Sequence, residues 1–301
     1  MTSLRLLNMV LLALLALGAG CSKPPAAASA ATPPPVAVAP TALICHVGGT
    51  MLPVIEELVK QYREATGEVV EVNTGDSGSL LALIETQKQG DLYVCHDPFL
   101  DMLMNRKLGV DGWTVAELTP VIAVPKGNPK GIHDLRDLAR PELELFLTDY
   151  EYSTMGRLLP TLFGKADIDF AALNRTKIIN THRSGSQAAN VVKMGNADAT
   201  IVWNAVVALR ADALEAVPIT AYLPQPYVDS VTSATGKAYR LMPVRVTVAT
   251  LACSAHQDRA VALARFIAGS ERQAAFRRLG YTVEAQHLRQ EYAAGQAIPR
   301  P

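Results

Sequence analysis

The sequence predicts an α/β fold in which mostly parallel strands are covered by helices on both faces. From Ala42 onward, short β-rich runs alternate with longer segments whose apolar residues recur at helical spacing. Small hydroxyl residues and glycines follow the early strands, at the points where helices begin. A chain of 301 residues is long enough for one large or two modest domains of this class.

The first elements form a strand, helix, strand, helix, strand series. The run LICHV begins at Leu43, and the segment after it carries Leu52 and Ile55 at helical spacing. Thr50 is a suitable N-cap for this helix, and Gly67 is a suitable end. The strand EVVEVNTG, the helix DSGSLLALIETQKQG and the strand DLYVCHDP complete the series.

The rest of the chain continues the alternation without a repeat of fixed period. The strand PVIAVPKGNP comes first, and YRLMPVRVTVATLAC is a later, longer strand. Two helices are expected in DRAVALARFIAGSERQAAFRRLGY. The segments between the two strands are LELFLTDY, GRLLPTLFG, TKIIN, SQAANVVKMGN and ATIVWNA.

The beginning of the chain has the layout of an export signal. Arg5 precedes an apolar run, residues 6–17, that is too short to span a bilayer comfortably, and small residues lead to Cys21. This layout resembles a bacterial lipoprotein signal, in which cleavage before the cysteine is followed by lipidation of its thiol; ordinary cleavage nearby is the alternative. We expect a signal peptide at 1–20, a lipid on Cys21 and an Ala/Pro-rich tether at 21–40.

Charge and motifs argue against several function classes. The chain has 28 basic and 28 acidic residues, so it gives no reason to expect nucleic acid or an anionic membrane surface as partner. No GxSxG motif occurs, and His133, His182 and His256 have no sequence-local partner that would make a triad. We therefore predict a protein that is not an enzyme and that has no cofactor.

Two phrases, LICHVGGT and LYVCHDPF, each end an apolar strand in Cys-His. Because adjacent side chains of a strand point to opposite faces, Cys45 and His46 cannot share a face, and neither can Cys95 and His96. Three interpretations are open. The first is buried thiols with histidines near strand ends, the second is a Cys45–Cys95 disulfide, and the third is a soft-metal or thiol-reactive site. We favour the first, without metal ligation, because no CxxC or HxxxH spacing occurs.

Several expected helices begin with Ser, Thr or Gly directly after a strand. Helix N-termini present backbone N–H groups without intrahelical partners and a partial positive charge, so together they can hold a small oxyanion without Lys or Arg. Asp76, next to Ser77, opposes an anion and is expected to face solvent or to pair with a neighbour. Taken singly, such residues are most often only caps.

Seven segments, in order, resemble the molybdate-binding component of bacterial ABC transporters, a type II periplasmic solute-binding protein. They are the helix opening at Thr50, GDSGSLLALIE, DLYVCHDPFLDML, VIAVPKGNPKGIHDLRDLA, TDYEYSTMGR, VKMGNADATIVW and ARFIAGSERQAAFRRLGY. The resemblance implies a two-lobed fold, each lobe a mostly parallel sheet flanked by helices, with two crossover strands. Lobe 1 would comprise 41–121 and 241–301, and lobe 2 would comprise 122–240.

The resemblance also implies a set of ligand-binding residues. Thr50 and Ser77 match the two serines with which the family holds its anion, and Met155 and Gly185 match donors of backbone N–H groups. Trp203 stands where the family has a tyrosine, so an indole N–H replaces a hydroxyl. The expected ligand-binding residues are Thr50, Ser77, Thr154, Met155, Ser184, Gly185 and Trp203.

The expected function is capture of a tetrahedral oxyanion, first molybdate or tungstate, by a monomeric periplasmic lipoprotein that delivers it to an ABC permease. Its membrane contact would be the lipid anchor alone, and its lobes would close about the crossover strands. One alternative is a binding protein for another anion, such as sulfate, phosphate or an organic acid. Another is a periplasmic redox or metal-handling protein that uses the Cys-His pairs.

Overall fold

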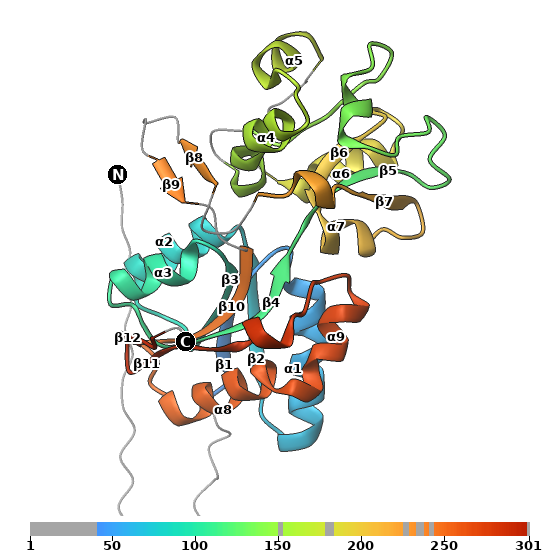
Figure 1. Cartoon of the computed structure of the whole chain (residues 1–301). Helices are drawn as coiled ribbons and strands as arrows, with labels where there is room; N and C mark the ends of the chain where they lie inside the picture. Colours follow the sequence, from blue (N-terminus) through green and yellow to red (C-terminus); the bar gives the residue numbers. More distant parts are fainter. Residues whose placement is uncertain are drawn as a thin grey trace, which may run out of the picture. The chain divides into compact units, whose positions relative to one another are not determined.

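The computed structural model describes residues 41–149, 153–177, 184–224, 229–232, 238–240 and 244–299 (Figure 1). The expected signal peptide, the lipidation site Cys21 and the tether lie outside these ranges. Within the described ranges, no helix is long and apolar enough to cross a membrane.

A seven-stranded sheet has the strand order β12-β11-β4-β10-β3-β1-β2. Strand β1 runs parallel to β2 and β3, whereas β10 is antiparallel to both β3 and β4. The strands are β1 (Leu43–Gly48), β2 (Val70–Gly75), β3 (Leu92–His96), β4 (Gly109–Leu118), β10 (Val244–Leu251), β11 (Arg289–Ala293) and β12 (Gln296–Ala297).

Helices cover both faces of this sheet (Figure 1). Helices α1, α8 and α9 pack on the face that carries Cys45 and Val94, and α2 and α3 pack on the face that carries Tyr93 and Cys95. Their bounds are α1 (Leu52–Thr66), α2 (Ser77–Gln87), α3 (Phe99–Asn105), α8 (Gln257–Ala268) and α9 (Gln273–Arg278), with short 3-10 helices η3 (Ser270–Arg272) and η4 (Ala285–His287).

A three-stranded sheet, in the order β6-β5-β7, is antiparallel throughout. Its strands are β5 (Pro120–Pro125), β6 (Thr200–Trp203) and β7 (Leu214–Pro218). The elements around it are η1 (Leu135–Ala139), α4 (Thr154–Lys165), α5 (Phe170–Lys177), α6 (Gly185–Lys193), α7 (Asn204–Ala208) and η2 (Thr220–Tyr222), and β8 (Ser230–Thr232) pairs with β9 (Ala238–Arg240).

The expectation of mostly parallel sheets is therefore wrong outside the block β2-β1-β3. The chain leaves the seven-stranded sheet along β4 and enters the three-stranded sheet along β5, with only Thr119 between them. It later returns along β10. A strand that arrives from another sheet needs no helical crossover beside its neighbour, so it can pair antiparallel. The change of sheet falls just before the predicted boundary at 121/122; the division into two lobes stays a prediction.

The first helix begins later than expected. Met51 donates its backbone N–H to the Gly48 carbonyl at 2.8 Å, and this turn delays helix α1 to Leu52. Met51 is therefore the N-cap, and the assignment of Thr50 as N-cap is wrong. The expected end at Gly67 is confirmed, because this residue adopts a left-handed conformation with φ 77°.

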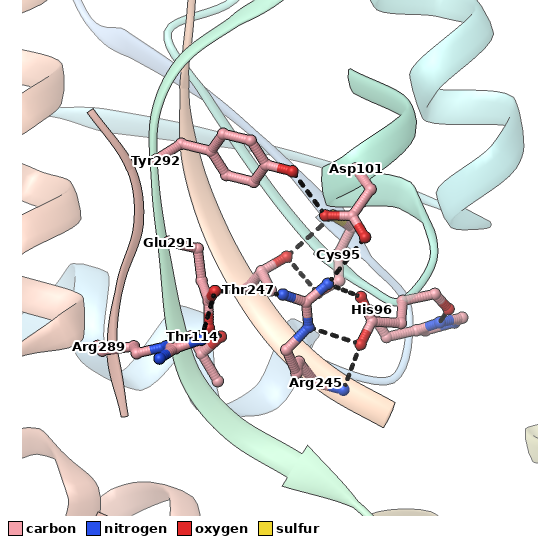
Figure 2. Close-up of polar contacts among 10 residues, drawn as sticks. Cys95, His96, Asp101, Thr114, Arg245, Thr247, Arg289, Glu291 and Tyr292 are labelled. Carbon is pink, nitrogen blue, oxygen red and sulfur yellow. Dashed lines mark hydrogen bonds and ion pairs between the residues drawn. The ribbon is translucent and has the colours of Figure 1, made fainter. Parts of the chain in front are cut away.

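A buried arginine joins the ends of several elements of the large sheet (Figure 2). Arg245, only 5% exposed, donates through Nε and Nη2 to the two carboxylate oxygens of Asp97 at 2.8 and 2.6 Å. It also reaches Asp101 at 3.1 Å and Glu291 at 3.5 Å. Strand β10 is thereby tied to the end of β3, to α3 and to β11.

Replacing Arg245 by Met should lower the free energy of unfolding by about 3–5 kcal/mol, because the variant leaves buried carboxylates without their cationic partner. Chemical denaturation measures this loss. The control is Arg278→Met: Arg278 pairs with Glu57 at the surface, with side chains 57% and 33% exposed, and should cost at most about 1 kcal/mol. Equal losses in the two variants would contradict a special role for the buried cluster.

Candidate functional site

A cavity of about 600 Å³ has walls from elements of both the seven-stranded and the three-stranded sheet. All seven predicted ligand-binding residues line it: Thr50, Ser77, Thr154, Met155, Ser184, Gly185 and Trp203. The other lining residues are Gly48, Gly49, Gly75, Asp76, Gly78, Ser79, His96, Phe99, Ser153 and Ser186. The structure thus brings the predicted set together around one cavity; that these residues bind a ligand stays a prediction.

The cavity wall consists largely of helix starts. The turn before α1 and the first residues of α2, α4 and α6 all contribute to it. Ser153 caps α4 by accepting the Gly156 N–H at 2.7 Å, and Ser184 is the N-cap residue of α6. Since the first N–H groups of a helix have no intrahelical partner, such a wall offers backbone donors.

The Ser77 hydroxyl is a buried polar group of this wall that lacks a partner in the described part of the chain. Ser77 is 5% exposed, and its Oγ has no hydrogen-bond partner among the described residues. It lies against the end of β1, where a Cβ placed on Gly48 would come within 2.6 Å of it. A buried hydroxyl without a partner costs free energy, so a polar ligand in the cavity would satisfy it.

Two buried tyrosines support the polar segments of this wall from behind. The Tyr93 hydroxyl donates to the Ser77 carbonyl, and the Tyr281 hydroxyl donates to the Thr50 carbonyl at 2.7 Å. Burial raises the pKa of both phenols, so both remain donors over the physiological range. Sequence reasoning did not find either residue, because each contacts another element of the fold and no local pattern marks the contact: Tyr93 lies 16 residues from Ser77, and Tyr281 lies 231 residues from Thr50.

The charges around the cavity are few. Among the described lining residues, Asp76 is the one carboxylate, and no Lys or Arg is present. The Asp76 carboxylate accepts the Ser79 N–H at 3.0 Å and so caps helix α2. Arg183, which directly precedes the N-cap residue Ser184 in the sequence, lies outside the described residues.

His96 also lines the cavity, although it was not among the predicted ligand-binding residues. It ends strand β3, and its Nδ1 lies 2.8 Å from the Asp97 carbonyl oxygen. Its ring centroid is 5.7 Å from that of Phe99 and 6.5 Å from that of Trp203. Removal of the ring from water lowers the pKa of His96, and the contact with Asp97 partly opposes this shift.

The two Cys-His phrases lie on neighbouring parallel strands, as expected. Cys45 packs in the core on one face of the sheet and Cys95 in the core on the other; both are fully buried and free, so the disulfide interpretation is wrong. His46 is buried, and its Nε2 is hydrogen-bonded to the Gln89 carbonyl oxygen at 3.1 Å. Within the described residues, no group of three or more His, Cys, Asp or Glu is placed to hold a metal ion.

Comparison with known proteins shows the family. The sequence model for bacterial extracellular solute-binding proteins matches residues 44–282, and the chain belongs to this family. A Haemophilus influenzae protein named "Putative binding protein" is 28% identical over 122 residues, which are 40% of this chain. The matched region spans about half (50%) of that curated relative.

Solved structures show the same fold. The periplasmic molybdate-binding protein of Azotobacter vinelandii superposes with a TM-score of 0.60 at 16% identity, over 80% of this chain and 99% of that one. The sulfate-binding protein SubI of Mycobacterium tuberculosis gives 0.61 at 19%, over 81% and 88%. The chain therefore has the fold of the type II periplasmic binding proteins.

Burial raises the pKa of the Cys45 and Cys95 thiols to about 12, so both should resist alkylation in the folded protein at about pH 8. The partly exposed Cys253 serves as the internal control and should react first. Peptide mapping after iodoacetamide treatment, with and without denaturant, measures the three sites. If Cys45 and Cys95 stayed unmodified in denaturant and reacted only after reduction, a disulfide would be present.

Proposed function

We propose that this chain, a member of the bacterial extracellular solute-binding protein family, captures a tetrahedral oxyanion outside the cytoplasm and delivers it to an ABC permease. The observation that carries this proposal is the set of helix starts around one cavity, with the unpartnered Ser77 hydroxyl among them. In this proposal the protein acts as a monomer, without catalysis, cofactor or metal.

The chemistry of the cavity suits such a ligand. A tetrahedral oxyanion presents acceptor oxygens in several directions, and donors from different helix starts can meet them separately. Each helix start also adds a partial positive charge. Thr50 and Ser77 would supply hydroxyl donors, the starts of α4 and α6 would supply backbone N–H groups, and the Trp203 indole would supply a further N–H.

Molybdate and tungstate are the first candidate ligands. The ordered resemblance of the sequence to molybdate-binding proteins supports them. Sulfate is the second candidate, because a sulfate-binding protein of the same fold superposes equally well and because Trp203 replaces the tyrosine of the molybdate family. Lobe 1 (41–121 and 241–301) and lobe 2 (122–240) would close over the anion.

A thermal-shift panel of molybdate, tungstate, sulfate, phosphate, arsenate and divalent metals tests the proposed function. A ligand that binds only the folded state adds about 2.7 kcal/mol of stability at a hundredfold excess over its dissociation constant. Stabilisation by one or more oxyanions is expected. Stabilisation by metals alone, with stoichiometric metal in the purified protein, would favour a metal-handling protein instead.

Replacing Ser77 by Ala should weaken binding of the anion identified in this panel by about tenfold to a hundredfold, the scale of a lost hydrogen bond to a charged group. Isothermal titration measures the affinity. Ser270→Ala is the matched control, because Ser270 is exposed and does not line the cavity. Unchanged affinity in Ser77→Ala would remove this residue from the ligand shell.

We further propose that the protein is held at the membrane by a lipid on Cys21. Replacing Cys21 by Ser should move it from the membrane fraction to the soluble periplasm, because the Ala/Pro-rich tether has too few large apolar side chains to hold the protein in lipid. Cell fractionation with immunoblotting measures the distribution. Cys253→Ser is the matched control and should stay with the membrane; retention of Cys21→Ser there would contradict the anchor.

A further inference from the structure

We propose that His96 contacts the ligand directly and that capture of an oxyanion is coupled to uptake of a proton by this residue. This inference rests on the proposed function, which it deepens by naming a proton as the second species captured. His96 would be a specificity-determining residue that the predicted ligand set lacks.

The hydrogen bond of His96 fixes which ring nitrogen can reach a ligand. A carbonyl oxygen only accepts, so the contact with the Asp97 carbonyl at 2.8 Å places a hydrogen on Nδ1. Nε2 is then the remaining polar atom of a ring that lines the cavity, and it has no hydrogen-bond partner among the described residues. In the neutral ring Nε2 carries a lone pair; only in the protonated ring does it donate.

The arginine cluster holds Asp97, the residue whose carbonyl the His96 ring contacts. Arg245 engages both carboxylate oxygens of Asp97, whose Oδ2 also accepts the Arg245 backbone N–H at 2.8 Å. The Asp97 backbone N–H in turn donates to the Arg245 carbonyl at 3.0 Å. The Asp97 side chain is therefore held by the arginine, and its carbonyl is held in place to orient His96.

The charge of the cavity explains why the proton matters. An oxyanion such as molybdate or sulfate has only acceptors, so a neutral Nε2 would face it lone pair to lone pair. A protonated His96 offers instead a charge-assisted N–H donor. The described lining residues include the Asp76 carboxylate and no Lys or Arg. Among these residues, protonated His96 would therefore carry the one full positive charge.

Other charged groups near His96 are already engaged. The Asp76 carboxylate caps α2, and Arg245 and Asp101 pair with one another. On β4, Glu117, which interacts electrostatically with Asp97, pairs with His287 at 2.9 Å. Among the described residues, Asp97 is the charged group that acts on His96 directly. Arg245 on β10, Asp101 on α3 and Glu117 on β4 interact with Asp97 or its partners, and Asp76 on α2 lines the same cavity as His96.

The sign of the pH dependence follows from these contacts. Desolvation holds the pKa of His96 below its ordinary value, so near neutral pH the ligand-free ring is uncharged. A bound anion stabilises the protonated ring and raises that pKa. Between the pKa of His96 in the free protein and its pKa in the complex, the dissociation constant should rise about tenfold per pH unit. In this window the protein should take up about one proton for each anion bound.

Calorimetric titration with sodium molybdate and sodium sulfate, from about pH 6 to pH 9, tests the inference, because both anions stay fully deprotonated there. Repeating it in buffers of different ionisation enthalpy counts the protons taken up. The expected result is an uptake approaching one proton per anion between the free and the bound pKa of His96, with affinity falling as pH rises through this window.

Two variants assign the proton to its residue. In His96→Gln the amide N–H donates at every pH, so proton uptake should disappear and the pH dependence should flatten. His133→Gln is the matched control, since His133 is exposed and does not line the cavity, and it should keep the wild-type proton uptake. If His96→Gln does not fold, ¹⁵N spectra of histidine-labelled wild type should show a neutral His96 ring without anion and a protonated one with it.

The outcomes separate the two proposals. Anion binding without proton uptake, or with equal uptake in His96→Gln, would overturn the role of His96 and leave the proposed function standing. No binding of any oxyanion by the wild-type chain would overturn both. A His96 ring that remains neutral in the anion-bound state would also overturn the role of His96, whatever the variants show.

Discussion

The parallel pairing of β1 with β2 and β3 is the constraint on which the rest of the site depends. In parallel strands the carboxyl ends lie at one edge of the sheet, so the segments after Gly48, after Gly75 and at His96 must meet there. All three strands lead into helices within a few residues, and the turn before α1 and the starts of α2 and α3 contribute to the same cavity. The polar wall is thus a consequence of strand direction, and the side chains refine it.

The same edge also holds a buried ionic cluster, and the two features have opposite electrical character. Arg245 forms ion pairs with Asp97, Asp101 and Glu291, which neutralise its charge. The cluster therefore serves to fix strand ends rather than to attract an anion. By contrast, the donors that the cavity offers to an anion are neutral hydroxyls and the backbone N–H groups at helix starts. The fold thus keeps a buried arginine at this edge of the sheet without placing it among the described residues that line the cavity.

The sequence was sufficient for the features that depend on local pattern. The order of the elements from β1 to β3, the end of α1 at Gly67 and the convergence of residues such as Thr50 and Ser77 follow from alternation, from small residues after strands and from the family resemblance. Helix α3 and strand β4, which come next in the chain, were not predicted. The features it missed depend on contacts across the chain: Tyr281 reaches Thr50 over 231 residues, and no local signal marks such a partner. The antiparallel half of the large sheet was missed for the same reason, since strand direction is set by where the chain returns from the other sheet.

The two supporting tyrosines show how a helix start can be made suitable for an anion. The Thr50 and Ser77 carbonyls are acceptors beside a cavity that is proposed to hold negative charge, and an acceptor turned toward an anion would repel it. Tyr93 and Tyr281 donate to these two carbonyls from the protein interior. Both carbonyls are thereby satisfied from behind, so neither is left as an unpaired acceptor beside the cavity. His96 follows the same arrangement, because its interior nitrogen is satisfied by a carbonyl and only its second nitrogen is left for the ligand.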